Sequence, residues 1–219
     1  MARICVIGDL MLDHYVFCST HKISPEAPVP VLLPKEEKFL LGGAANVAAN
    51  LSSLGHQVVL VGSLAKDKSG KIISKLLSEK FIEFINLATA SITTRKRRYL
   101  VGSYQVNRVD DEEKILRNPN KEKMNELKIC FQESDLIVVS DYNKGLITKE
   151  IMMVLRGSRK KFIVDPKVSD WSLYKGAYMI CPNKIELGLA VGEEIFNMQN
   201  ALESLAKKYN IQSIVATLG

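Results

Sequence analysis

The chain has no long apolar run, no paired cysteine motif and only three histidines. Each of these absences excludes a class of function. No hydrophobic stretch approaches the roughly 20 residues that a membrane-spanning helix needs, so we expect no membrane partner. The first residues reach Asp9 too soon to resemble a signal peptide, which predicts a cytoplasmic protein. The four cysteines are widely spaced and form no ligand pattern with the histidines, which favours reduced, structural thiols.

Recognised nucleotide and nucleic-acid motifs are also missing. A Walker loop of the form Gly-x-x-x-x-Gly-Lys-Ser/Thr does not occur. The net charge of +6 is partly concentrated in one run, Arg95–Arg98, but no aromatic residues interleave with it. We therefore expect no nucleic-acid partner, and we interpret the basic run as a contact for a small anionic substrate or as a solvated strand face.

Apolar runs typical of buried strands alternate with amphipathic helical stripes along most of the 219 residues. The predicted strands are 3–8, 57–61, 81–87, 136–140, 161–165, 178–181 and 211–216. The predicted helices are 44–54, 67–77, 118–131, 148–155 and 198–209, with Asp67, Thr148 and the pair Asn118-Pro119 at three of their starts. This alternation predicts an α/β fold with a doubly wound, mostly parallel sheet flanked by helices.

Two stretches interrupt the alternation of strands and helices. The sequence shows no internal repeat and no flexible linker. Residues 15–41 contain four prolines and short extended runs, and residues 92–109 are rich in β-forming side chains. We expect these stretches, taken as about 14–41 and 92–109, to form a small β-lid over one end of the sheet. The whole chain, 1–219, then forms one domain.

Polar residues follow several predicted strands, where ligands bind in open parallel sheets. Asp9 and Asp13 come after the first strand and could accept hydrogen bonds from adjacent sugar hydroxyls, although a turn-and-cap pair also explains them. Gly42 and Gly43 open a helix, allow close approach of a ligand to the backbone, and place Asn46 one turn in.

Three further loops carry charged or amide side chains after successive strands. Asp141 and Lys144 share one loop, Lys167 follows the next strand, and Asn183 and Glu186 lie three residues apart at a helix start. The lysines would neutralise phosphate, and a carboxylate such as that of Glu186 beside a phosphate site is typical of Mg²⁺ held partly through water. Each residue alone is also explained as a cap or surface group, but together the loops favour a binding site.

These loops resemble those of the ribokinase-like carbohydrate kinases. The strings that carry the resemblance are GDLMLD at 8–13, ISPEAPVPV at 23–31, GGAANVA at 42–48, SDYNKG at 140–145, DPK at 165–167 and PNKIE at 182–186. The string at 23–31 resembles the sequences of the family branch that acts on heptose 7-phosphate. The string GGAAN is typical of the wider family. The resemblance runs from Arg3 to Gly219.

The resemblance implies ATP-dependent phosphorylation of D-glycero-D-manno-heptose 7-phosphate at the anomeric hydroxyl, with Mg²⁺, in ADP-heptose and lipopolysaccharide biosynthesis. The partners that it implies are a sugar-phosphate substrate and a second copy of the chain, bound through the β-lid. Two alternatives stay open, namely a catalytically inactive sugar-phosphate-binding protein and another sugar kinase of the same family.

The resemblance also implies roles for individual residues. The substrate-binding residues are expected to be Asp9, Asp13, Gly42, Gly43, Asn46, Arg108, Asp141 and Lys144. The residues expected on the nucleotide and metal side are Lys167, Asn183, Glu186, Thr217 and Gly219, with Glu186 nearest the metal and the last two in a Thr-x-Gly turn. Arg108 and the run Arg95–Arg98 would bind the 7-phosphate, because a guanidinium group binds phosphate in a bidentate way.

One segment of the family pattern does not occur in these 219 residues. Family members carry a Gly-Ala-Gly-Asp segment whose glycines form an anion hole and whose aspartate deprotonates the acceptor hydroxyl, and the sequence contains no such string. Loss of both groups costs orders of magnitude in rate. We therefore expect a C-terminally truncated kinase domain without a catalytic base, which is inactive or very weak on its own.

Overall fold

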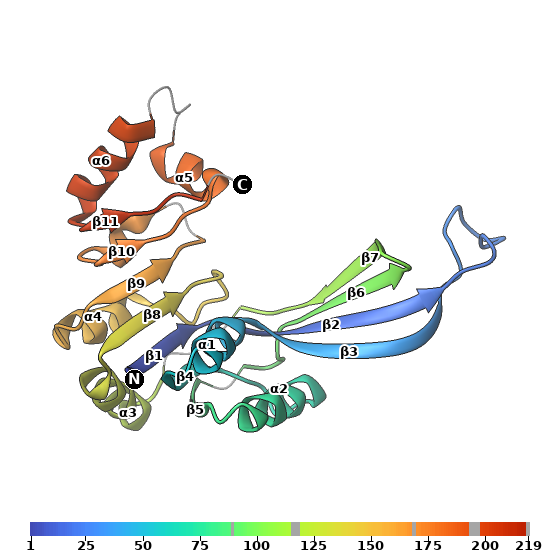
Figure 1. The fold of residues 1–219 in the computed structure, drawn as a ribbon, viewed down its shortest axis with the longest axis horizontal. Helices are drawn as coiled ribbons and strands as arrows, with labels where there is room; N and C mark the ends of the chain where they lie inside the picture. Colours follow the sequence, from blue (N-terminus) through green and yellow to red (C-terminus); the bar gives the residue numbers. More distant parts are fainter. Residues whose placement is uncertain (89, 115–118, 168–169, 193–197, 218–219) are drawn as a thin grey trace.

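The computed structural model describes residues 1–88, 90–114, 119–167, 170–192 and 198–217, and it contains two β-sheets (Figure 1). The larger sheet consists of β1 (Arg3–Gly8), β4 (Gln57–Ser63), β5 (Glu83–Ala88), β8 (Leu136–Ser140), β9 (Phe162–Asp165), β10 (Met179–Ile180) and β11 (Ser213–Ile214). The second sheet consists of β2 (Leu10–Ser19), β3 (Leu33–Gly43), β6 (Arg95–Val101) and β7 (Tyr104–Asp111). The helices are α1 (Ala44–Ser53), α2 (Lys68–Glu79), α3 (Lys121–Glu133), α4 (Lys149–Gly157), α5 (Lys184–Val191) and α6 (Met198–Tyr209), with a 3₁₀ turn at Trp171–Tyr174.

The larger sheet has the strand order β11-β10-β9-β8-β1-β4-β5, and all of its strand pairs are parallel. This confirms the predicted doubly wound α/β fold. The chain builds the sheet outward from β1 in both directions, through β4 on one side and through β8 on the other. The strand order therefore reverses at β1, and the carboxyl end of β1 is the place where open parallel sheets bind ligands.

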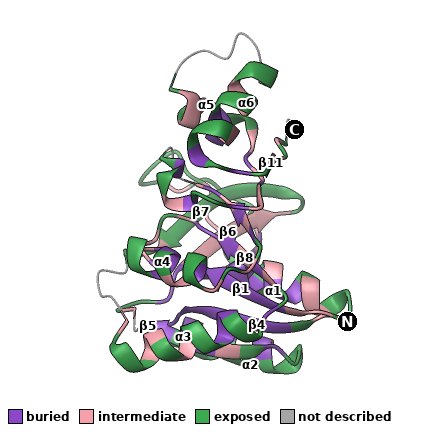
Figure 2. Ribbon diagram, turned by 90° about the vertical axis from the view of Figure 1, so that its left-hand side faces the viewer, coloured by how far each residue is buried: buried purple, intermediate pink, exposed green. Residues whose placement is uncertain are grey.

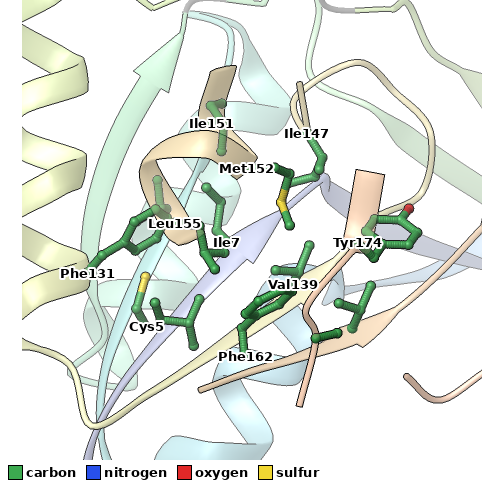
Figure 3. Packing of buried hydrophobic residues seen from close by; sticks show 14 of the residues in the cluster. Cys5, Ile7, Phe131, Val139, Ile147, Ile151, Met152, Leu155, Phe162 and Tyr174 are labelled. Atoms are coloured by element: carbon green, nitrogen blue, oxygen red, sulfur yellow. The ribbon is translucent and has the colours of Figure 1, made fainter. Parts of the chain in front are cut away.

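Helices cover both faces of the larger sheet, and the side chains of β1 alternate between them. Ile4 and Val6 pack with α1 and α2 in one buried cluster. Cys5 and Ile7 pack in the other, where Figure 3 shows them beside Phe131 of α3 and several residues of α4. Buried residues accordingly concentrate on the central strands (Figure 2). A strand buried on both faces explains the continuous apolar run that predicted it.

The local signals for helix starts are confirmed at two helices and wrong at a third. Asp67 caps α2 by accepting the N–H of Gly70, and Thr148 caps α4. The third helix, α3, begins later than predicted, because the side chain of Asn120 accepts the N–H of Lys123 and acts as the cap. Pro119 therefore precedes the helix instead of lying in its first turn, and Asn118 lies outside the described residues.

The second sheet extends away from the body of the molecule, as Figure 1 shows for β2 and β3. Its order is β3-β2-β6-β7, with β2 and β6 parallel and the other pairs antiparallel. The strands β2 and β3 together extend from Leu10 to Gly43, beyond the expected range 14–41. The strand β7 extends to Asp111, beyond the end of the expected range 92–109. As a result, β2 continues almost directly from β1, and β3 leads directly into α1.

Among the described residues, no helix has the length and apolar character needed to cross a bilayer.

Candidate functional site

Asp9 is the first residue after β1 and holds two neighbouring segments in place. Its Oδ2 accepts the backbone N–H groups of Tyr142 at 2.8 Å and Lys144 at 3.1 Å, and its carbonyl accepts the N–H of Ala44 at 3.0 Å. The residue is only 3% exposed, and burial raises the pKa of its carboxyl to about 6. Asp9 therefore fixes the loop after β8 and the start of α1, which together form the edge of the site.

Asp13 lies on β2 directly against a glycine of β3. A Cβ added at Gly42 would come within 2.5 Å of Oδ2 of Asp13, so the absence of a side chain at Gly42 allows the carboxylate to lie there. Gly43 has φ +56°, a conformation that favours glycine, and no side chain caps the helix that begins after it. Asn46 follows in the first turn of α1 and is exposed. The structure thus brings Asp13 against Gly42, and Gly43 leads directly into the helix turn that carries Asn46.

The same face of the second sheet carries part of the basic run. Nη1 of Arg98 lies 2.5 Å from Oδ1 of Asp13, and Nζ of Lys96 lies 3.1 Å from Oδ2 of Asp110. Arg108 is the cross-strand partner of Arg98, and its Nε lies 2.9 Å from Oδ1 of Asp110. Arg108 therefore lies next to the Arg98–Asp13 pair but is already engaged with the carboxylate of Asp110.

The other half of the run points to the opposite face, toward α2. Nη2 of Arg95 lies 2.6 Å from Oδ2 of Asp111, and Nη2 of Arg97 lies 3.7 Å from the same oxygen. These arginines line a cavity of about 280 Å³ together with His14 and Glu37. The alternation of a strand therefore separates the four consecutive basic residues into two pairs with different surroundings.

The loop after β8 carries two of the predicted site residues, and both have partners within the protein. Oδ2 of Asp141 accepts the hydroxyl of Tyr174 at 2.6 Å, and Oδ1 accepts the N–H of Asn143 at 2.7 Å. Burial raises the pKa of this carboxyl. Nζ of Lys144 lies 2.6 Å from Oε2 of Glu112, just after β7. Asp141 thus stabilises its own loop, whereas Lys144 links the loop to the second sheet.

A second cluster lies beyond β9 and β10. Nζ of Lys167 lies 2.7 Å from Oε1 of Glu186 and 3.0 Å from Oδ1 of Asp165. Burial lowers the pKa of Lys167, but hydrogen bonds with both carboxylates outweigh burial and raise it. Asn183 and Glu186 form a capping box at the start of α5, with side-chain to backbone bonds in both directions. The helix start that the sequence predicted here therefore exists, and both residues act as its cap.

Thr217 lies beside the start of α5. It forms a parallel bridge with Asn183, and its N–H donates to the carbonyl of Pro182 at 2.9 Å. The segment after β11 is thereby brought next to the Lys167–Glu186 cluster. Gly219 lies outside the described residues.

The full length of the chain, residues 1–219, matches the pfkB family carbohydrate kinase profile. The chain belongs to this family. Curated relatives called "Bifunctional protein HldE" are 38% identical in Nitratiruptor sp. over 222 residues and 38% in Helicobacter acinonychis over 229 residues. The alignments cover 99% and 100% of this chain but 48% and 50% of the relatives, so the chain spans about half of their length.

Solved structures show the same fold as this pfkB family chain. The tetrameric inhibited form of phosphofructokinase-2 from Escherichia coli aligns with a TM-score of 0.75 at 18% identity, over 100% of this chain and 74% of that one. The same enzyme in complex with fructose-6-phosphate aligns with a TM-score of 0.72 at 16% identity, over 100% and 75%. At these identities the likeness establishes the architecture alone.

Some contacts of this family member could not be found from local sequence patterns. Tyr174 is 33 residues from Asp141, and Glu112 precedes Lys144 by a predicted strand and helix. The pairing of Arg98 with Asp13 had a partial signal in the basic run. What the run could not indicate is that only its second and fourth members share a face with Asp13.

Proposed function

We propose that this chain transfers the γ-phosphoryl group of ATP to the anomeric hydroxyl of D-glycero-D-manno-heptose 7-phosphate. The product, heptose 1,7-bisphosphate, would supply ADP-heptose and lipopolysaccharide biosynthesis in the cytoplasm. Membership of a carbohydrate kinase family, the similarity to the HldE relatives and the string ISPEAPVPV at 23–31 support the proposal.

One observation carries the proposal further than family membership: charged side chains of both clusters act on a single side chain, that of Tyr142. Burial raises the pKa of Tyr142, and the charges of Asp13 and Glu186 add to the effect, whereas that of Lys167 opposes it. The ammonium of Lys167 lies 5.4 Å from the centre of the Tyr142 ring. A carboxylate suited to sugar hydroxyls and an ammonium suited to phosphate are thus near one residue at the carboxyl edge of the sheet.

In the proposed reaction, one cluster orients the sugar and the other neutralises charge on the phosphates. The anomeric oxygen bonds to the γ-phosphorus, the bond from that phosphorus to the bridging oxygen of ADP breaks, and the hydroxyl proton passes to a base. Phosphoryl transfer depends mainly on positioning and on stabilisation of charge. Asp13, Gly42 and Asn46 would orient the sugar, and Lys167 would neutralise charge on the transferred group. We assign the base to no residue of this chain.

The residues present fit a magnesium ion that arrives with the nucleotide. No group of three or more His, Cys, Asp and Glu side chains converges within the part of the chain that the structure describes. Glu186 instead offers one carboxylate, already hydrogen-bonded by Asn183 and Lys167. Mg²⁺ commonly keeps several waters and binds through one or two carboxylates plus substrate phosphates. Glu186 would hold the ion, which supplies charge neutralisation to the phosphates.

The second sheet is the proposed lid, and its exposed apolar side chains support a homodimer formed through it. These side chains are Leu33, Leu40, Tyr104, Val106 and Val109. Light scattering on the purified chain tests the dimer, and a mass equal to one chain at all concentrations would contradict it.

Phosphorus NMR tests the proposed activity. The chain would be incubated with heptose 7-phosphate, ATP and Mg²⁺ for hours, and, because no base is assigned to its residues, we expect the anomeric phosphate signal to grow only very slowly. An Asp13→Ala chain is the control that should produce none. If calorimetry shows that both substrates bind but no product forms, the data favour a sugar-phosphate-binding protein instead. If heptose 7-phosphate does not bind, the proposed substrate is wrong.

A further inference from the structure

The carboxylate proposed to hold the sugar is already occupied by a cation. Oδ1 of Asp13 and Nη1 of Arg98 are 2.5 Å apart, and both side chains are about one-fifth exposed, at 21% and 19%. A charge-assisted bond of this length competes with hydrogen bonds from neutral sugar hydroxyls. A ligand that uses both oxygens of the Asp13 carboxylate must therefore displace Arg98 from Oδ1 or give it another partner.

The surroundings of Arg98 favour a second anion. Lys96, Arg98 and Arg108 share one face of β6 and β7, and their carboxylate partners there are Asp13 and Asp110. Three cations thus face two anions. A phosphate monoester carries about −1.5 to −2 charges near pH 7, so its arrival would compensate the excess.

We propose that Arg98 is the residue that makes the site specific for a phosphorylated sugar, through an exchange of ion-pair partners. The phosphate of the substrate binds the guanidinium of Arg98 and draws it away from Asp13. The freed carboxylate of Asp13 then accepts hydroxyl groups of the same sugar. A sugar without the phosphate offers Arg98 no anion, so it has to compete with the ion pair. This proposal rests on the proposed function, since it concerns the substrate of that site.

The neighbouring basic residues do not offer the same exchange. Arg95 and Arg97 face α2 and bind Asp111, and Lys96 is held by Asp110. Within the run Arg95–Arg98, which the structure describes in full, only Arg98 pairs with Asp13. Arg98 also lies over the ring of Tyr15, with 5.2 Å from Cζ to the ring centre, and the ring supports the guanidinium plane when its partner changes.

The test is calorimetric titration of the wild-type, Arg98→Gln and Arg97→Gln chains with heptose 7-phosphate and with the same heptose lacking phosphate. We expect Arg98→Gln to bind heptose 7-phosphate roughly 10- to 100-fold more weakly, the usual effect of losing a charged hydrogen-bond partner. The same variant should bind the unphosphorylated heptose several-fold more tightly, because Asp13 is free. The sequence groups Arg97 with Arg98, but Arg97 lies on the opposite face of the strand and pairs with Asp111, so Arg97→Gln should change neither affinity.

Opposite shifts for the two ligands are the signature of the exchange. Equal weakening of both ligands would assign Arg98 a structural role and overturn the proposal, and so would an unchanged affinity for the unphosphorylated sugar. Arg98→Lys keeps the charge and should restore part of the discrimination, which guards against a misfolded glutamine variant.

The design separates this proposal from the proposed function. A wild-type chain that fails to bind heptose 7-phosphate contradicts the function. If fructose 6-phosphate binds instead and Arg98→Gln gives the same reversal against fructose, the exchange holds although the assigned substrate is wrong.

Discussion

Oδ2 of Asp9 accepts the backbone N–H of Tyr142 at 2.8 Å, a contact that spans 133 residues of sequence. It fastens the loop after β8 to the carboxyl end of β1, where the strand order of the larger sheet reverses. The Tyr142 ring, in turn, lies 5.4 Å from the ammonium of Lys167, and the charges of Asp13 and Glu186 also act on the Tyr142 hydroxyl. The geometry of the candidate site therefore depends on a buried carboxylate that is more suited to holding the loop than to binding a ligand.

Asp9→Asn should change how stability depends on pH. Burial raises the pKa of Asp9 from 3.8 to about 6, so the folded chain retains a proton that the unfolded chain has lost between about pH 4 and pH 6. Stability therefore falls as pH rises through this window, by about 3 kcal/mol for roughly two pKa units. Asparagine cannot ionise, so urea unfolding of the variant should lack this decline. A wild-type-minus-variant difference that stays constant from pH 4 to pH 6.5 would contradict the assignment.

Gly42→Ala should disturb the sugar side of the site. The added Cβ would lie 2.5 Å from Oδ2 of Asp13 and 2.8 Å from Cγ of Met11, so the carboxylate must move. We expect roughly tenfold weaker binding of the sugar phosphate by calorimetry, the size typical of one lost hydrogen bond to a charged group. Gly157→Ala is the matched control, because its Cβ meets nothing within 4 Å, and it should bind normally. Equal affinities for the two variants would contradict the role of Gly42.

Tyr174→Phe should destabilise the loop after β8. The Tyr174 hydroxyl donates to Oδ2 of Asp141 at 2.6 Å, and both residues are buried. Removing the donor leaves a buried carboxylate oxygen without that partner, which costs about 1–3 kcal/mol. Urea unfolding should show this loss, whereas Tyr104→Phe, at a residue that is 79% exposed, should be neutral. Unfolding curves that coincide for the two variants would remove the structural role given to Asp141.

Lys167→Ala should weaken the nucleotide side and leave the sugar side intact. Its ammonium bridges Asp165 and Glu186, so its loss removes the cation from that cluster and leaves two carboxylates near the incoming phosphates. Calorimetry should show roughly tenfold or greater weakening of MgATP binding, with heptose 7-phosphate binding unchanged. Lys80→Ala, just after α2, is the control. Loss of sugar binding in Lys167→Ala would place this lysine elsewhere in the mechanism.

Much of the larger sheet was predictable, because each element carries its own local signal. The apolar run of β1 is continuous since both of its faces are buried, and the stripes of α2 and α6 match one covered face each. Asp67 and Thr148 were readable as caps, since a cap bonds only to the next turn. Strand order had no such signal, since the sequence does not state that β1 lies between β4 and β8.

The candidate site was predictable in its residues but not in their partners. Asp9, Asp13, Asp141 and Lys144 were identified by their position after strands. Which of them face inward is decided by contacts with segments far away in sequence, such as Arg98 with Asp13 over 85 residues. Local propensity cannot report such contacts, so the buried and structural character of Asp9 and Asp141 emerged only from the fold.

Hydrogen–deuterium exchange with each ligand alone tests most directly whether the two clusters form one divided kinase site. With heptose 7-phosphate, we predict protection of 10–19 and 95–101 in the second sheet. With MgATP, we predict protection of 183–191 and 213–217 around α5 and β11. Protection by both ligands in the same segments, or in loops away from the carboxyl edge of the sheet, would contradict the division of the site.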